Sequence, residues 1–222
     1  MSKTTPKQRI FEQLARAAKA MASANRLELL EVLGQGERSV DGLAQSCGMS
    51  IANTSHHLQV LREGGLVQSR KEGLQVIYRL SDPAVVALVA DLGRVAERHL
   101  AEVERIVREN FSGQDGLQPV RQGELKRLLK SGEAVVLDVR PPEEYAAGHI
   151  KGALNVPLKD FPKQIAKLPK SREIIAYCRG PYCMLAVDAV AQLRRRGYRA
   201  RRFEAGYPQW AAANPPPKKR SA

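Results

Sequence analysis

The chain has 222 residues, 43% of them hydrophobic, so it is long enough to form one or two domains with packed cores. Its three cysteines have no zinc-ligand spacing and are too few for a disulfide scaffold, which favours reduced thiols and a cytoplasmic protein. The N-terminal segment is basic and amphipathic, so we expect no signal peptide. No apolar run has the length of a membrane span, so we expect no membrane partner.

The formal net charge of +13 is typical of proteins that bind nucleic acids, but the charge is unevenly distributed. Residues 1–118 carry 15 Lys and Arg against 14 Asp and Glu, whereas residues 119–222 carry 21 against 9. We therefore interpret the excess in the C-terminal half as steering of anionic donors or as a solvated surface. Contact with flanking DNA is the less favoured alternative.

Four helices are predicted in the N-terminal part of the chain. Apolar side chains recur at helical spacing over 7–21, and three further helices begin at the capping residues Ser23, Ser39 and Ser50. The last two of these helices are short and are joined by a turn at 48–50. This arrangement is typical of a helix-turn-helix.

A β-hairpin and a long helix are predicted next. Strands at 66–70 and 75–80 are joined by a turn at 71–74, which indicates a wing. A single helix is predicted over 83–110, with a proline in its first turn. Its apolar seam recurs at three- and four-residue steps, so we expect a homodimer through the 83–110 helix, and packing of the seam on its own domain is the alternative.

The span 23–110 resembles the ArsR family of winged-helix repressors, most clearly in the run SIANTSHHLQVLREGGLV at 50–67. The resemblance implies that this run holds the recognition helix and leads into the wing. It also implies a homodimer that binds operator DNA at an inverted repeat, with half-sites about one helical turn apart. On the recognition helix, Ile51, Leu58 and Leu61 are expected to face the core.

Polar residues of the recognition helix and basic residues near the wing are the predicted DNA contacts. Polar side chains on the helix suit base edges or phosphates, and the cations suit phosphates. A solvated surface residue is the alternative for any one of them, but the whole set on one helix and wing favours DNA. The polar group is Asn53, Thr54, Ser55, His56 and Gln59, and the basic group is Arg62, Arg70, Lys71 and Arg79.

The resemblance raises the question of a sensory metal, and we predict none. One frequent ArsR site places thiolates in the third helix, but the matching stretch 38–43 has no cysteine. His99 and Glu102 match half of a second site, in the dimer helix. Their partners would be valine and leucine, which cannot bind a metal. Cys47 is a sulfur sensor or, in the interpretation we prefer, a small buried residue.

The C-terminal half begins after a polar linker at 113–118 and predicts an α/β domain. A helix at 124–129 precedes its first strand, and the apolar run at 174–176 reads as a buried strand that ends near Cys178. A helix is predicted from 184 to 193. Cys178 therefore lies in a tight loop before a helix N-terminus, where N–H groups and the helix dipole favour an anion and lower the pKa of a thiol. An inert buried cysteine is the alternative.

Four motifs surround this cysteine in order: DVR at 138–140, EY at 144–145, GHIKGALNVP at 148–157 and GYPQW at 206–210. Together they resemble the rhodanese (sulfurtransferase) family over roughly 119–214. The resemblance implies an α/β domain with a mostly parallel sheet. It also implies that Cys178 takes sulfur from a small donor and holds it as a persulfide, with no cofactor.

The loop departs from the common rhodanese pattern C-x-x-G-x-R, because Pro181 is its fourth residue and Cys183 its sixth. Arg179 is a candidate to replace the missing arginine as an anion-binding group. Cys183 is either a resolving thiol for the persulfide or only a substitute that begins the helix. A phosphatase is excluded because its arginine position holds Met184. The predicted active-site loop is Arg179, Gly180, Pro181, Tyr182, Cys183 and Met184, and the predicted supporting pair is Asp138 and Arg140.

The sequence thus predicts a winged helix-turn-helix domain (1–112, mainly α), a linker (113–118), a rhodanese domain (119–214) and a disordered tail (215–222). We expect a DNA-binding regulator that represses transcription and a sulfurtransferase that uses Cys178. Two alternatives stay open. One is a transcription factor with a non-catalytic rhodanese sensor, and the other is a sulfurtransferase whose N-terminal half only dimerises.

Overall fold

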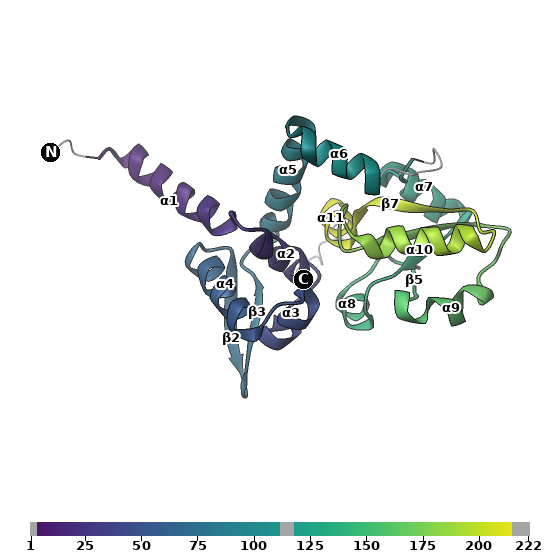
Figure 1. Cartoon of the computed structure of the whole chain (residues 1–222), viewed down its shortest axis with the longest axis horizontal. Coiled ribbons are helices and arrows are strands. Elements are labelled where there is room, and N and C mark those ends of the chain that lie inside the picture. Colours follow the sequence, from purple (N-terminus) through teal and green to yellow (C-terminus); the bar gives the residue numbers. More distant parts are fainter. Residues whose placement is uncertain (1–3, 112–117, 215–222) are drawn as a thin grey trace, which may run out of the picture. The chain divides into compact units, whose positions relative to one another are not determined.

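The computed structural model describes residues 4–111 and 118–214, so most of the predicted linker and the whole predicted tail lie outside the described residues (Figure 1). The chain divides into two compact units, Met1–Ala90 and Asp91–Ala222. Each unit is described by itself. Within the described ranges, no helix is both long and apolar enough to cross a membrane.

The first unit contains the four predicted helices: α1 (Pro6–Met21), α2 (Ala24–Leu33), α3 (Val40–Cys47) and α4 (Ile51–Glu63). The predicted caps at α3 and α4 are confirmed, because the Ser39 and Ser50 hydroxyls accept hydrogen bonds from backbone N–H groups in the first turns, at 3.2 and 3.3 Å. Ser23 precedes α2 but its side chain makes no such bond. The helix-turn-helix is therefore formed by α3 and α4, as predicted.

The wing is confirmed as an antiparallel hairpin of β2 (Val67–Glu72) and β3 (Gln75–Leu80), with the short β1 (Arg38–Ser39) on the other side of β3. The turn is tighter than predicted, because Glu72 and Gln75 still pair and only two residues connect them. One of these is Gly73, whose φ of 59° suits glycine.

The core of the first unit lies between these helices and the hairpin. Leu58 and Leu61 of α4 are fully buried, as predicted. The expectation for Ile51 is wrong, because its side chain is 55% exposed. Ile51 is the first residue of α4, so no preceding helical turn covers it. The other large buried side chains of this core include Leu29, Leu30, Leu33, Leu43, Leu66 and Tyr78.

The prediction of one helix over 83–110 is wrong, because the structure has two helices there, α5 (Ala84–His99) and α6 (Ala101–Asn110). Leu100 between them has an extended backbone. Arg98 and His99 end α5, whereas acidic residues occupy the first turn of α6. Cations stabilise helix C-termini and anions stabilise N-termini, so these charges favour two helix ends at Leu100.

The second unit contains a four-stranded parallel sheet of order β5-β4-β6-β7. Its strands are β4 (Ala134–Asp138), β5 (Leu154–Asn155), β6 (Glu173–Cys178) and β7 (Ala200–Gly206). All five residues of β4 are buried, as expected for a parallel strand covered on both faces. The predicted α/β class with a parallel sheet is confirmed.

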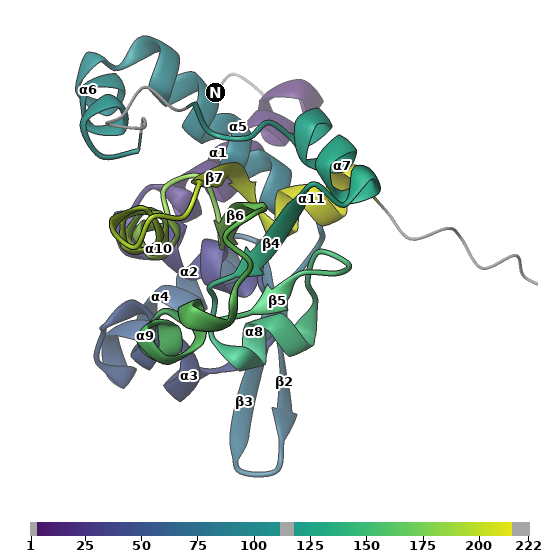
Figure 2. The ribbon, with the colours of Figure 1, turned by 90° about the vertical axis from the view of Figure 1, so that its right-hand side faces the viewer.

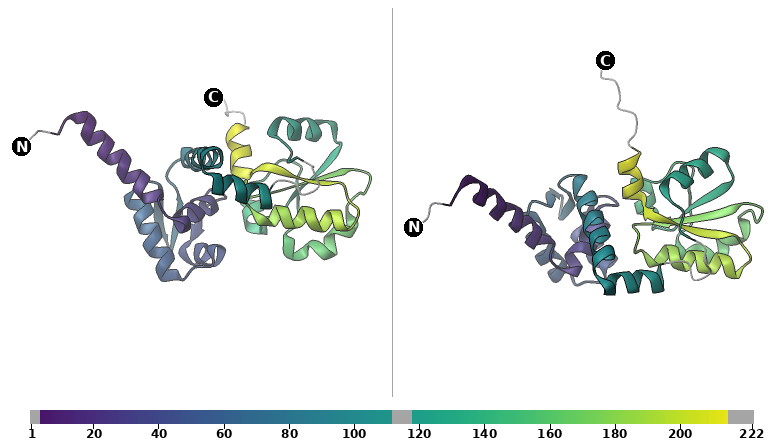
Figure 3. Two further views of the ribbon diagram at one scale, coloured as in Figure 1. Left: turned by 45° about the horizontal axis from the view of Figure 1, so that its top comes forward. Right: turned by 90° about the horizontal axis from the view of Figure 1, so that it is seen from above.

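Helices cover both faces of this sheet (Figures 2 and 3). On one face α9 (Phe161–Gln164), flanked by 3-10 turns at Leu158–Asp160 and Ile165–Lys167, and α10 (Met184–Arg195) pack against Leu137, Ala176 and Cys178. On the other face α7 (Gln122–Ser131) and α11 (Tyr207–Ala213) pack against Val136, Ile175 and Tyr177, and α8 (Pro142–Ala147) follows β4. Side chains of successive strand residues alternate between the faces, so Cys178 faces α10 and Tyr177 faces away from it.

Candidate sulfur site and nucleic-acid interface

Cys178 ends the central strand β6, and the loop 179–183, which we call the sulfur loop, leads from it to α10. The carboxyl ends of parallel strands are where α/β proteins place their sites. Cys178 is 1% exposed, and Cys183 is half-buried at the N-cap of α10. The two sulfur atoms are joined as a disulfide, with the Cα atoms 6.2 Å apart, inside the usual range.

Gly206, the first residue of the GYPQW motif, shapes the sulfur loop from the neighbouring strand. The β6–β7 pairing shifts in register after Ala176, which brings Gly206 level with Cys178. A Cβ atom on Gly206 would lie 2.0 Å from the carbonyl oxygen of Arg179. Only glycine therefore permits the loop backbone to pass this closely.

A buried polar network lies beside the loop on the opposite face of the sheet. Asp138 and Arg140 are fully buried and form an ion pair, with Nη2 and Oδ2 2.5 Å apart. The Tyr177 hydroxyl donates to Asp138 at 2.5 Å and accepts from the N–H of Ile150 at 3.0 Å. Burial first, and then the charge of Asp138, raises the pKa of Tyr177 far above its ordinary value, so this hydroxyl keeps its proton.

Arg140 also fixes the turn that carries the GHIKGALNVP motif. Its Nη2 donates to the carbonyl oxygen of Gly148 at 2.7 Å. A Cβ atom on Gly148 would lie 2.4 Å from the Tyr207 hydroxyl, so a larger residue here would have to displace the Tyr207 ring. The Asn155 amide donates to the carbonyl oxygens of Asp138 and Arg140, at 3.1 and 3.0 Å. These motif residues thus build the support under the loop.

Arg179 is held by Glu144, the acidic residue of the EY motif. Its Nε and Nη2 donate to Glu144 Oε1 at 3.0 and 2.7 Å. Glu144 is 1% exposed and the Arg179 side chain 16%. A guanidinium held by a carboxylate through one edge has that edge unavailable to a sulfur donor, which limits the predicted anion-binding role of Arg179.

The predicted DNA interface of the first unit is formed by α4 and the wing. Asn53, Ser55, His56 and Gln59 are all exposed on α4. Thr54 is fully buried, and its hydroxyl donates to the carbonyl oxygen of Ser50 at 2.9 Å. The prediction that Thr54 contacts DNA is therefore wrong, because its position on the helix turns it toward the core.

The basic residues near the wing are exposed, but two of them form ion pairs with acidic neighbours. Glu37 forms ion pairs with Arg70 and, at 3.9 Å, with Arg79. Both arginines are about half exposed, so the pairs lie on the surface, where such interactions contribute little to stability. All four predicted basic contacts remain on the surface, namely Arg62, Arg70, Lys71 and Arg79.

Comparison with known protein families agrees with both halves of this description. Residues 23–69 match the family of bacterial regulatory proteins named after arsR, and residues 121–213 match the rhodanese-like domain. An HTH-type transcriptional regulator of Mycobacterium tuberculosis, Rv0324, is 40% identical over 207 residues, which cover 93% of this chain and 91% of that protein. The chain belongs to the ArsR family. It is a DNA-binding regulator that carries a rhodanese-like domain.

Two further similar proteins each match one half of this ArsR-family regulator. A sulfurtransferase of Allochromatium vinosum is 32% identical over 87 residues, which cover 39% of this chain and 79% of that protein. The winged helix-turn-helix domain of Mb0332 from Mycobacterium bovis, a homodimer in solution by NMR, is 38% identical. That match covers 46% of this chain and 94% of the domain, with a TM-score of 0.42.

The structure of this ArsR-family regulator also gives two residues contacts that the sequence analysis did not predict. His57 of α4 is one: its Nε2 lies 3.3 Å from the Asn25 amide, and burial first, then the charges of Arg26 and His56, lowers its pKa. Glu144 is another, since its role depends on a partner 35 residues away in the chain. Only the folded chain brings such pairs together. Cys47 packs against the core of the first unit but is only half-buried, so it is less buried than the preferred interpretation expects.

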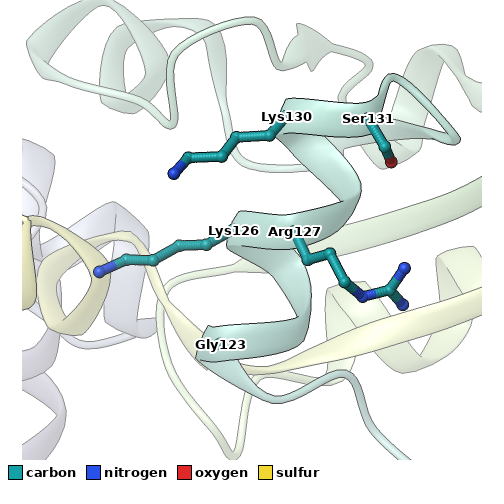
Figure 4. Close-up of a pocket in the computed structure, with 5 residues that line it drawn as sticks. All are labelled: Gly123, Lys126, Arg127, Lys130 and Ser131. Carbon is teal, nitrogen blue, oxygen red and sulfur yellow. The ribbon is translucent and has the colours of Figure 1, made fainter.

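A shallow hollow on α7 is lined by Gly123, Lys126, Arg127, Lys130 and Ser131 (Figure 4). Lys126 and Lys130 extend to the same side of the helix, and Arg127 points away from them (Figure 4). Arg127 forms an ion pair with Glu133 at 3.4 Å. This hollow lies on a different element from the sulfur loop and accounts for part of the positive charge of the C-terminal half. Among the described residues, no cluster of three acidic, histidine or cysteine side chains is arranged to hold a metal ion.

Proposed function

We propose that this ArsR-family regulator links sulfur chemistry at Cys178 to the control of transcription. The observation that carries the proposal is the Cys178–Cys183 bond in the loop after the central strand, in a chain that also has an ArsR-type helix-turn-helix. A pair of thiols five residues apart can hold sulfur, release it and be restored by thiol chemistry.

The proposed chemistry has two steps. The Cys178 thiolate attacks the outer sulfur of a donor such as thiosulfate, forming a persulfide and releasing sulfite. The Cys183 thiolate then attacks the Sγ atom of Cys178, which closes the disulfide and releases hydrosulfide. The second step is reversible, so hydrosulfide that attacks the Cys178 sulfur of the disulfide restores the persulfide and frees the Cys183 thiolate.

The surroundings of Cys178 support an anionic sulfur group in this loop. The helix α10 begins next to it, and helix N-termini stabilise negative charge. The uneven charge of the chain, with 21 Lys and Arg against 9 Asp and Glu in 119–222, favours the approach of anionic donors.

In the same proposal, the first unit binds operator DNA as a homodimer, reads an inverted repeat and represses transcription in the cytoplasm. Support for self-association comes from large apolar side chains that are exposed to solvent on two helices. Phe11 of α1 is 58% exposed, and Leu92 and Val95 of α5 are 46% and 59% exposed. Apolar groups gathered on helical faces in this way favour association with another chain.

One observation favours a second function, a sensor that holds sulfur without turnover. The loop has Cys183 where the common rhodanese pattern has arginine, and Glu144 holds Arg179 by one edge. A donor anion then has fewer cations to bind it, which slows a catalytic cycle without preventing a single reaction at Cys178.

Thiocyanate release from thiosulfate and cyanide separates the two functions. We expect the wild-type chain to release thiocyanate and Cys178→Ala to release none, because the persulfide cannot form. Cys183→Ala is the matched control and keeps the nucleophile. If wild type and Cys178→Ala release equal amounts with thiosulfate and with polysulfide, catalytic transfer at Cys178 is excluded.

Peptide mass spectrometry tests the resolving step, in which Cys183 attacks the persulfide on Cys178. Trypsin cleaves after Arg179, so the two cysteines fall in separate peptides, 173–179 and 180–194. We expect polysulfide to give a cross-linked peptide pair in the wild type and a stable persulfide on 173–179 in Cys183→Ala. The absence of the cross-linked pair under every donor would contradict a resolving role for Cys183.

A further inference from the structure

Tyr182, the residue before Cys183, contacts the helices that lead out of the first half of the chain. The second unit begins at Asp91 and so includes the end of α5 and all of α6, and we call residues 91–111 the arm. The Tyr182 hydroxyl lies 3.4 Å from Glu97 Oε2. Its ring meets the ring of Phe111 edge-on, with centroids 5.9 Å apart, a favourable geometry.

Gly93 provides the space for this contact. It lies inside the helix α5, where glycine destabilises by roughly 1 kcal/mol relative to alanine. A Cβ atom on Gly93 would lie 3.1 Å from the Tyr182 hydroxyl oxygen and 3.5 Å from its ring. A larger residue at position 93 would therefore require the Tyr182 side chain to move.

Arg202 of β7 contacts both the sulfur loop and the arm. Its Nη1 donates to the carbonyl oxygen of Pro181 in the sulfur loop at 3.1 Å, and its Nε donates to the carbonyl oxygen of Phe111 at 3.0 Å. Its guanidinium also lies 5.8 Å from the centroid of the Phe111 ring. One side chain therefore holds the sulfur loop and the end of the arm at once.

We propose that the arm is a docking surface for the sulfur loop, and that Tyr182 occupies it while Cys178 and Cys183 are bonded. The bond fixes Cys183, the direct neighbour of Tyr182, to the end of β6. Reduction by a dithiol adds two electrons and two protons, giving two thiols and the cyclic disulfide of the reductant. The loop then loses its cross-link, and Tyr182 leaves its contact with Gly93 and Glu97.

The position of the docking surface on α5 gives this contact a consequence for the regulator. At about 100° per residue, Gly93 and Glu97 lie on a different side of α5 from the exposed Leu88, Leu92 and Val95. One helix thus presents one side to the sulfur loop and another to solvent. The consequence for DNA binding rests on the proposed function, whereas the docking itself requires only the two thiols.

Hydrogen exchange of the full chain tests the docking. We expect amides in 91–111 to exchange roughly two- to tenfold faster after reduction with dithiothreitol, the range that follows from losing one aromatic contact. Tyr182→Ala and Gly93→Leu are expected to exchange fast in both states. Arg98→Leu places the same leucine side chain at an exposed position of α5, away from Tyr182, and keeps the difference. Equal exchange in the oxidised and reduced wild type overturns the proposal, as does an unchanged difference in Tyr182→Ala.

A redox titration supplies an independent readout, because coupling between two events is reciprocal. If the bond favours docking, docking favours the bond, so Tyr182→Ala is expected to shift the dithiothreitol equilibrium of the pair toward dithiol by the same two- to tenfold factor. An unshifted equilibrium, or a pair that diamide cannot oxidise, overturns the proposal. Thiocyanate release and DNA binding are measured separately, so a failure of the proposed function leaves these two results intact.

Discussion

At the scale of single residues, the rhodanese motifs are mainly a set of supports for one loop. Asp138, Arg140 and Tyr177 form a buried hydrogen-bonded group, and Glu144 orients Arg179. Although burial by itself lowers the pKa of Arg140, the hydrogen bond and charge of Asp138 raise it overall, so the guanidinium keeps its charge. A buried charge of this kind depends on its partner.

Asp138→Asn tests that dependence. We expect it to destabilise the second unit by about 3–5 kcal/mol, because it leaves Arg140 charged and unpaired in the core. Urea unfolding followed by the fluorescence of Trp210, the single tryptophan of the chain, measures the change. Glu133→Gln makes the same chemical change in an exposed ion pair and is expected to cost at most about 1 kcal/mol. Equal effects of the two variants would contradict the stabilising role of the buried pair.

At the scale of elements, helical periodicity decides which side chains of α4 can meet DNA. Asn53 and Thr54 are adjacent in sequence and both polar, yet one is exposed and the other fully buried. A step of one residue turns a helix by about 100°, which is enough to move a side chain from solvent to core. The Thr54 hydroxyl satisfies its hydrogen bond within the helix and so tolerates this position.

This contrast predicts opposite outcomes for neighbouring substitutions. Asn53→Ala is expected to weaken binding to the DNA upstream of the protein's own gene by about 1–3 kcal/mol, because we propose that this side chain reads a base edge. Thr54→Val keeps the shape of a buried side chain and should leave the affinity unchanged. Fluorescence anisotropy with labelled duplexes at one fixed salt concentration measures both. A larger loss for Thr54→Val would contradict the assignment of the exposed face.

At the scale of the whole molecule, α1 and α5 expose large apolar side chains that no other part of the single chain covers among the described residues. Leu88, Leu92 and Val95 follow one another at three- and four-residue steps and are each about half exposed. A helix with such a stripe gains free energy by covering it with a second copy. In our proposal, the part of the predicted dimer seam that lies on α5 therefore contributes to self-association.

Leu92→Glu is expected to convert the proposed dimer into a monomer, because a charge would have to be buried against apolar side chains. Sedimentation velocity at micromolar concentration measures the mass. Leu74→Glu, at the fully exposed tip of the wing, introduces the same charge away from the stripe and is expected to leave the dimer intact. A Leu92→Glu chain that remains dimeric would place the self-association elsewhere.

The sequence by itself determined both families, the helix-turn-helix with its wing, and the caps at Ser39 and Ser50, because these depend on local patterns and on motifs read along the chain. It also placed Cys178 after a buried strand. The tertiary structure alone decided that Thr54 and Ile51 exchange their expected environments, and that Glu144 holds Arg179. It alone showed that Gly93 makes room for Tyr182, 89 residues later. These outcomes depend on contacts between distant segments, and spacing along a chain does not specify which side chains meet when the chain folds.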